Sequence, residues 1–185
     1  MLEPKHTINQ NRSQWIKCAA LILWVAMLGF FFAKVEIQIE GGQGWAASLP
    51  TWRIEEHWLL NIFWGGRAMT GYHAWVFSFM FLAFHTPLLM AGRFSLRLET
   101  RILGSVALFW MVEDFLWFVL NPVYGIRRFT PEHIPWHKNW FLWMPVDYWV
   151  FTGVTVLLFW YSYRSIPEKK TPISTDHEQK DKPAE

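Results

Sequence analysis

The stretch ILGSVALFWMVEDFLWFVL, residues 102 to 120, decides the fold because it is long and apolar yet carries two adjacent acids. A helix that crosses a bilayer needs about 20 mostly apolar residues, and this stretch has that length. Glu113 and Asp114 would then lie within the hydrocarbon layer, where an ionised carboxylate costs at least about 2.5 kcal/mol. The stretch therefore predicts a membrane helix whose two acids need partners inside the protein.

Three other segments have the same apolar character, at residues 16 to 35, 69 to 92 and 145 to 163. The composition agrees, since 52% of the 185 residues are hydrophobic, 19% are aromatic and 14 are Trp, which is unlike a soluble protein. Backbone groups in hydrocarbon must be paired within each segment, so we expect helices, with a kink near Pro87. The predicted fold class is an all-α integral membrane protein with a four-transmembrane-helix bundle.

The two outer connectors, 36 to 68 and 121 to 144, are long and aromatic. The first begins with a β-like stretch, VEIQI at 35 to 39, and continues to an amphipathic helix predicted over 51 to 64. The second contains three prolines, which argue against a regular helix. We predict that the connectors fold onto the bundle as a cap. Their Trp residues would also suit an aromatic belt at the lipid headgroups, and the sequence leaves this alternative open.

Basic residues are distributed unequally between the two sides of this bundle. Eleven of the 17 Lys and Arg residues lie on the side of the two tails and of the 93 to 101 connector. The positive-inside rule then places both termini in the cytoplasm, at a bacterial inner membrane. The N-tail, 1 to 14, precedes the membrane domain, 15 to 163. The polar, proline-punctuated C-tail, 164 to 185, is predicted to be disordered.

Three histidines and three acids are expected near the outer ends of these helices. Nitrogen and oxygen donors of this kind suit a divalent first-row metal, namely Zn, Fe, Mn or Cu. The predicted metal ligands are His73, Glu113, His133, His137 and Asp147. Glu113 and Asp114 are also the predicted catalytic acids, because buried carboxyl groups beside histidines can act as general acids and bases. We expect at least one of these two acids to reach a histidine of the set.

The same residues also have structural explanations, which the sequence leaves open. Asp147 suits a helix N-terminus, where a carboxylate meets free N–H groups. The two central acids could form an ion pair with Arg127, Arg128 or a histidine.

Small residues recur every seven positions in the first two helices, for example Ala26 and Ala33 in the first and Gly71 and Ser78 in the second. Such stripes let helices approach closely, so they predict that these two helices pack together. His85 continues the second stripe and is predicted to contact another helix rather than the metal ligands.

Several classes of protein are disfavoured. The single Cys18 rules out an internal disulfide framework, and the connectors carry no basic block for nucleic acid.

Three classes of function remain. One is an outer-facing site, metal-bound or acid/base, that acts on a lipid or another apolar molecule. The others are a non-catalytic membrane subunit or assembly factor, and a small transporter or proton conductor. The expected partners are the lipid bilayer and either further copies of the chain or a membrane complex. Two adjacent buried acids favour the first class.

Overall fold

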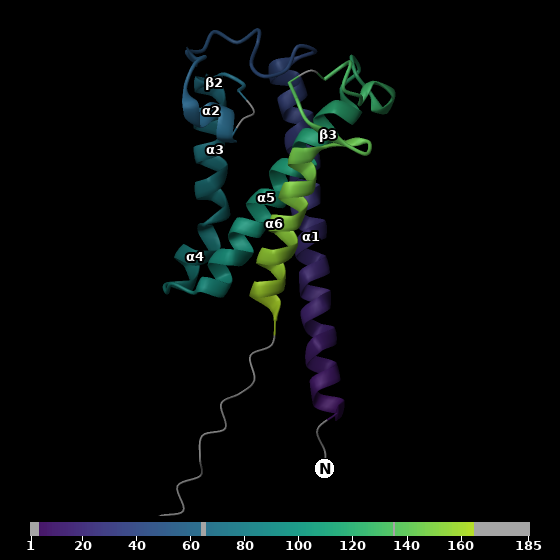
Figure 1. Cartoon of the computed structure of the whole chain (residues 1–185). Coiled ribbons are helices and arrows are strands. Elements are labelled where there is room, and N and C mark those ends of the chain that lie inside the picture. The colour runs from purple at the N-terminus through teal and green to yellow at the C-terminus, as the bar shows by residue number, and fades with distance from the viewer. Residues whose placement is uncertain (1–3, 64–65, 135, 165–185) are drawn as a thin grey trace, which may run out of the picture.

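The computed structural model describes residues 4 to 63, 66 to 134 and 136 to 164, and it is mostly helical (Figure 1). Among the described residues, three helical segments are long and apolar enough to cross a membrane: Arg12–Glu40, Gly71–Ala91 and Leu96–Leu120. The segment predicted as a fourth span is a helix of 18 residues, which ends one residue before the predicted C-tail. Apart from Arg164, that tail lies outside the described residues. The main helices are α1 (Pro4–Glu40), α3 (Gly71–Phe84), α4 (Thr86–Ala91), α5 (Leu96–Leu120) and α6 (Val146–Tyr163).

Helix α1 is longer than the sequence predicts at both ends. Its 37 residues span about 55 Å at 1.5 Å per residue, so its N-terminal part projects beyond the other helices (Figure 1). The β-like interpretation of 35 to 39 is wrong, because this stretch completes α1. The helix continues because Ile37 is buried against α5. It ends where Gly41 takes up a left-handed backbone at φ +69°, as is common after a helix C-terminus.

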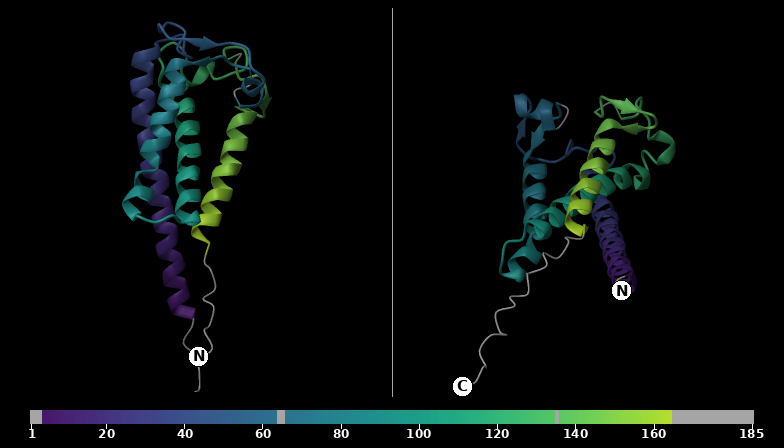
Figure 2. Two further views of the ribbon diagram at one scale, coloured as in Figure 1. Left: turned by 90° about the vertical axis from the view of Figure 1, so that its left-hand side faces the viewer. Right: turned by 60° about the horizontal axis from the view of Figure 1, so that its bottom comes forward.

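Helix α5 is the central helix, since it contacts α1, α3 and α6 and lies between α3 and α6 in Figure 2. Two glycines allow its neighbours to come close. A Cβ at Gly104 would lie 2.7 Å from Phe159 Cε1 and 3.3 Å from Leu158 Cβ, both on α6. A Cβ at Gly29 of α1 would lie 3.1 Å from Val112 Cγ1 on α5. Close helix contact at these points sets the spacing of the bundle.

Gly29 and Ala33 of α1 pack against α5 and not against α3, so the predicted pairing of stripes is wrong. Ala33 is fully buried in a cluster with Trp117 and Phe118 of α5. Ser78 of α3 is exposed and donates to Ala74 O at 2.8 Å. The aromatic face of α5 offers α1 far more apolar area than the small residues of α3 can, and burial is proportional to area.

Two buried clusters hold the helices together. The first lies towards the middle of the bundle and is formed by Cys18, Val25, Leu108, Phe109 and Phe159. The second lies towards the ends of α1 and α5 and is formed by Ala33, Ile37, Trp117, Phe118 and Ile134. Ile134 belongs to the second connector and is fully buried. This connector is therefore folded onto the helices.

Both connectors lie at the same end of the helices (Figures 1 and 2). In the structure the connectors run from 41 to 70 and from 121 to 145, and each includes a minimal antiparallel strand pair, β1 with β2 and β3 with β4. The predicted amphipathic helix is reduced to six residues, because the chain before it forms strand β1 instead. The elements of the connectors are β1 (Arg53–Ile54), α2 (Trp58–Phe63), β2 (Met69–Thr70), η1 (Ile126–Arg128), β3 (Trp140–Phe141) and β4 (Met144–Pro145).

The second predicted span is interrupted at His85, between α3 and α4. Pro87 lies in the first turn of α4, where a missing N–H is tolerated. One nitrogen of the His85 ring lies 2.6 Å from Phe81 O, and the other lies 3.2 Å from Glu99 Oε1 of α5. The prediction of an interhelical contact for His85 is confirmed.

We predict that Gly104→Ala lowers the free energy of unfolding by about 1–3 kcal/mol, because the new methyl group forces α5 and α6 apart. Gly153→Ala in α6 is the matched control, since nothing lies within 4 Å of a Cβ there. It should be neutral or stabilise by up to about 1 kcal/mol through helix propensity. Thermal unfolding in detergent, followed by circular dichroism, measures both. Equal effects at the two positions would contradict the close approach at Gly104.

Candidate functional site

Two glutamates that the sequence analysis did not select lie on the last turns of α1. Glu36 and Glu40 are four residues apart, so both point to one face of the helix. Each is only 6% exposed. The β-like interpretation of this stretch concealed them. Their signal was the continuation of the apolar spacing of Ala33 and Ile37 up to the Gly41 helix stop.

His73, a predicted metal ligand, faces this pair from the first turn of α3. Its backbone N–H donates to Thr70 Oγ1 at 3.2 Å, and its ring Nδ1 lies 2.7 Å from the same oxygen. This double contact orients the ring so that Nε2 lies 3.5 Å from Glu40 Oε1. A Cβ at Gly71 would lie 2.6 Å from Thr51 Oγ1, so only glycine allows the start of α3 to sit this close to the cap.

A strained turn covers the histidine. Trp45 and Ala46 both have left-handed backbones, at φ +48° and +52°, which cost about 1–3 kcal/mol each for residues other than glycine. Three contacts of the turn offset this cost. The Trp45 ring stacks on the His73 ring with 4.0 Å between ring centres, and its indole N–H donates to Ala68 O at 2.7 Å. The N–H of Ala46 donates to Glu40 Oε1 at 2.5 Å. The strain is thus concentrated directly over the buried acids.

Glu36, Glu40 and His73 each offer one ligand atom, and these atoms lie within 4.8 Å of one another. All three residues are buried. Glu36 also accepts a hydrogen bond from Tyr72 Oη at 3.0 Å. Each potential ligand therefore has a further hydrogen-bonding partner that holds it in place, as is usual around metal ions in proteins.

Glu113 lies in the interior, as predicted, but its neighbour is a carboxylate and not a histidine. It is 4% exposed, and its carboxyl group interacts with that of Glu36 through a side-chain hydrogen bond. Its Oε1 atom has no hydrogen-bond partner among the described residues. We call Glu36, Glu40, His73 and Glu113 the acid cluster.

Asp114 points to a different part of the protein. Its Oδ2 lies 3.3 Å from His137 Nε2 and accepts a hydrogen bond from Tyr148 Oη. The other ring nitrogen of His137 lies 3.3 Å from Asp147 Oδ2. The predicted contact between one of the two central acids and a histidine is thus confirmed. We call Asp114, His137, Asp147 and Tyr148 the histidine bridge.

The five predicted metal ligands are not brought together into a single site. His73 and Glu113 belong to the acid cluster, whereas His137 and Asp147 belong to the histidine bridge. His133 belongs to neither. It is exposed, its ring contacts Thr130 Oγ1 at 3.0 Å, and the adjacent Ile134 takes the buried position under the cap.

The ion pair with arginine that the sequence left open is also absent from the described part of the chain. Arg127 and Arg128 are exposed, and Arg128 donates to Val123 O at 2.7 Å. Neither forms an ion pair with Glu113 or Asp114. Arg67 lies closer to the acid cluster instead, with its guanidinium 4.4 Å from the centre of the Trp45 ring that covers His73.

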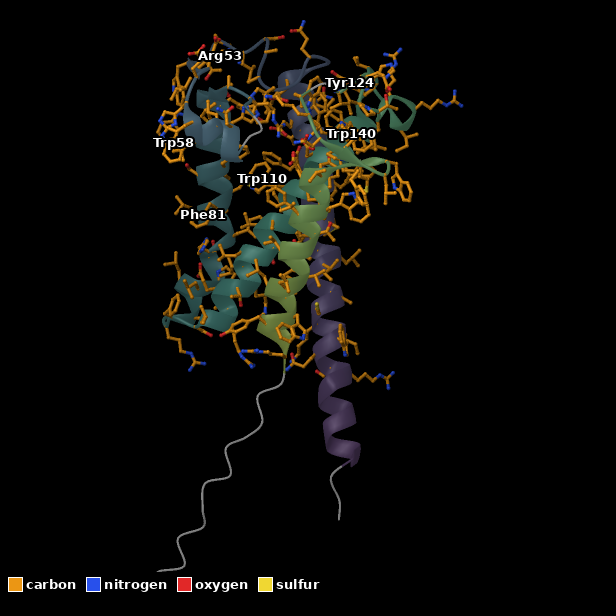
Figure 3. The ribbon with its side chains drawn as sticks, viewed as in Figure 1. Arg53, Trp58, Phe81, Trp110, Tyr124 and Trp140 are labelled. Atoms are coloured by element: carbon orange, nitrogen blue, oxygen red, sulfur yellow. The ribbon has the colours of Figure 1, made fainter. Side chains whose placement is uncertain are left out.

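Aromatic side chains surround the imidazole of the acid cluster. Besides Trp45, the His73 ring contacts Tyr72 at 5.2 Å and Phe77 at 5.6 Å between ring centres. Trp110 of α5 points towards α3 (Figure 3) and packs edge-on against Phe77 at 4.7 Å. Three carboxylates in such surroundings repel one another, and they need protons or a metal cation to be stable together.

Comparison of the chain with protein-family models, with curated proteins and with solved structures gave no match.

The histidine bridge predicts a pH dependence of stability. Burial by itself lowers the pKa of His137, but the contacts with Asp114 and Asp147 outweigh burial and the opposing charge of Arg67, so the pKa is raised. A raised pKa stabilises the folded protein below the ordinary value of about 6.5, and this contribution is lost as the pH rises through the raised pKa. The free energy of unfolding of the wild type should therefore decrease over that range.

His137→Gln should lack this part of the pH dependence and should be less stable by about 1–3 kcal/mol below pH 6.5, because Asp114 loses its partner. The half-exposed Asp147 contributes little, since solvent screens it. Thermal unfolding measured across the pH range tests this expectation. The exposed His133→Gln is the matched control and should keep the wild-type profile. An identical profile for His137→Gln would refute the assignment.

Proposed function

We propose that this chain is a small multi-pass membrane protein with four spans, formed by α1, by α3 with α4, by α5 and by α6. Large apolar side chains on the outer faces of these helices support membrane insertion, among them Leu23, Trp75, Phe79, Leu82 and Leu157, all of which are exposed. The bilayer would cover them, at about 25 cal/mol per Å². The chain would lie in a bacterial inner membrane with its cap on the outer side.

The positions of the basic residues support this orientation. Arg97 and Arg101 lie at the start of α5 and Arg164 at the end of α6, and Arg97 donates to Arg164 O at 2.8 Å. This end of the bundle is opposite the cap (Figure 1). Basic residues are enriched on the cytoplasmic side of membrane proteins.

Reporter fusions test the proposed topology. Fusions at residues 97 and 170 should both report the cytoplasm, because an even number of spans separates them, and a fusion at residue 45 should report the outer side. An external signal at residue 170 would show that α6 does not cross the membrane.

For the site itself, we propose that the acid cluster holds a divalent first-row metal ion, Zn, Fe, Mn or Cu, and that the chain uses it on a lipid or another apolar molecule. The observation that carries this proposal is the buried Glu36, Glu40 and His73 set, whose ligand atoms lie within 4.8 Å of one another. Oxygen and imidazole nitrogen are ordinary ligands of these ions. A bound ion would act as a Lewis acid that polarises a polar group of the substrate.

The surroundings of the cluster support an apolar substrate. Aromatic rings line the imidazole, and the nearby surface of α3 is apolar and exposed to the proposed bilayer. A water-soluble molecule would gain little from such contacts, whereas a lipid could reach the site from the side. The polar head of the lipid would meet the metal, and its hydrocarbon tail would remain in the bilayer.

A non-catalytic role as a subunit of a membrane complex is the second candidate. One observation favours it: within the Gly71–Ala91 span, an apolar window of 18 residues contains no buried residue, and α3 buries only Gly71 and His73 at its start. Lipid could cover this surface, but so could a helix of another protein. The activity measurement separates the two roles, because a purely structural subunit would change no apolar compound even if it held a structural ion.

We predict that the full-length chain, purified in mild detergent, contains about one equivalent of a divalent first-row metal. Glu40→Gln and His73→Gln should each reduce this content by at least about tenfold, because each removes a ligand. Elemental analysis gives the metal content. Mass spectrometry of lipid extracts from producing cells gives the activity, as a change in an apolar compound that the two variants do not cause.

Two exposed residues of the first connector supply matched controls. Glu56→Gln and His57→Gln remove the same groups at the surface, and both variants should keep the metal and the activity. A folded wild-type protein without metal, grown with each of the four ions supplied, would refute the metal site. If the protein binds metal but causes no change in any apolar compound of the lipid extracts, the metal site is supported and the proposed substrate class is refuted.

A further inference from the structure

We propose that the end of the bundle opposite the cap binds the phosphate group of an anionic phospholipid through Arg97 and Arg101 of α5 and Arg164, which follows α6. We call these three residues the arginine set. The inference rests on the proposed insertion of the chain into a membrane and goes beyond it. It assigns a second binding site, which lies at the other end of the helices from the acid cluster and needs no metal (Figure 1).

Hydrogen bonds to the end of α6 hold the arginine set in place. Arg97 Nη2 donates to Arg164 O at 2.8 Å, and Arg101 Nε donates to Ser162 Oγ at 3.1 Å. Ser162 is 2% exposed, and its hydroxyl donates in turn to Arg97 O at 2.8 Å. An unbroken series of hydrogen bonds therefore joins the three arginines. Side chains that are oriented before a ligand arrives lose less entropy when it binds.

No carboxylate pairs with the arginine set in the described part of the chain. Every ion pair found there involves a histidine and not an arginine. Glu99, the acid between Arg97 and Arg101 in the sequence, lies 3.2 Å from His85 Nε2 instead. Positive charges gathered without a counterion repel one another. An anion bound at this end would turn that repulsion into attraction.

The two arginines of α5 keep hydrogen-bond donors for such an anion. A guanidinium group carries five N–H donors, and Arg97 and Arg101 each use one side-chain nitrogen within the described chain. Because Arg101 Nε is taken by Ser162, both of its Nη groups remain. Arg97 and Arg101 are four residues apart, so they lie on one face of α5. Paired N–H groups of arginine match the oxygens of a phosphate group, which makes phosphate the expected anion.

Aromatic and apolar side chains of α6 indicate that the anion belongs to a lipid. The Arg101 guanidinium lies 4.3 Å from the centre of the Tyr163 ring, and that of Arg164 lies 5.4 Å from the centre of the Trp160 ring. Trp and Tyr are enriched at the depth of lipid headgroups. Trp160 and Leu157 are 61% and 65% exposed, and their spacing of three residues places them on one face. A phospholipid can cover this face with its hydrocarbon chains, whereas a soluble phosphate compound cannot.

Native mass spectrometry of the full-length protein tests this site. The protein is released from nanodiscs that contain equal amounts of phosphatidylglycerol, which is anionic, and phosphatidylcholine, which has no net charge. The ratio of the two lipids that stay bound measures the preference for an anionic headgroup, and the wild type should retain more phosphatidylglycerol. Arg97→Gln and Arg101→Gln should each reduce this ratio about fivefold, which corresponds to about 1 kcal/mol for one basic residue beside an anionic membrane surface.

Arg127→Gln is the matched control, because it removes an exposed arginine from the second connector, at the cap end. It should keep the wild-type ratio. An equal loss in Arg127→Gln would overturn the proposal by showing an effect of overall charge. A variant of Arg97 or Arg101 that unfolds at a lower temperature but keeps the wild-type ratio would also overturn it, since the hydrogen bonds to α6 would then be structural alone.

The wild type supplies two further outcomes. Equal retention of the two lipids would overturn the anionic site. Displacement of bound phosphatidylglycerol by inorganic phosphate would overturn the assignment to a lipid and show a site for a soluble anion. A folded protein that does not enter nanodiscs would refute the proposed membrane insertion itself. The metal content of the acid cluster is measured separately and does not depend on any of these results.

Discussion

The burial of three glutamate side chains against one another is the constraint on which the rest of the structure depends. Glu36 and Glu40 come from α1 and Glu113 comes from α5, and all three are almost inaccessible. Carboxylates are rarely buried unless something pairs with them. The features around them serve this arrangement: the close contact at Gly29, the orientation of His73 by Thr70, and the strained turn that places Ala46 N–H on Glu40.

Two adjacent acids of α5 lie in different environments because of helix geometry. Neighbouring side chains on a helix point about 100° apart, so Glu113 is directed to α1 while Asp114 is directed to His137 and Tyr148. The first acid is buried, and its Oε1 has no hydrogen-bond partner among the described residues. The second reaches a histidine that also contacts the half-exposed Asp147. The α5 backbone thus joins the acid cluster to the histidine bridge, which anchors the start of α6.

Local patterns in the sequence were sufficient to find the helices, because apolar length and composition determine which segments can be covered by hydrocarbon. They also predicted the inward orientation of Glu113 and a contact between at least one of the two acids and a histidine, since a buried acid must have a partner; the structure shows that Asp114 makes this contact. They failed at VEIQI, where an alternating polar and apolar pattern fits a strand and a helix end equally well. The burial of Ile37 against Trp117 and Phe118, which lie far along the chain, stabilises the helical conformation of this stretch.

The sequence by itself determined the helical class, three helices long and apolar enough to cross a membrane, and the presence of acids that need partners, because these follow from residue type and spacing. Only the tertiary structure decided which partners the acids have. His133 was as good a candidate as His137 until the fold of the second connector turned it outwards and buried Ile134. Glu40 met His73 only because α1 continues to Gly41 and the first connector returns the chain to its end. Contacts between distant segments depend on how whole elements pack, and no local pattern carries that information.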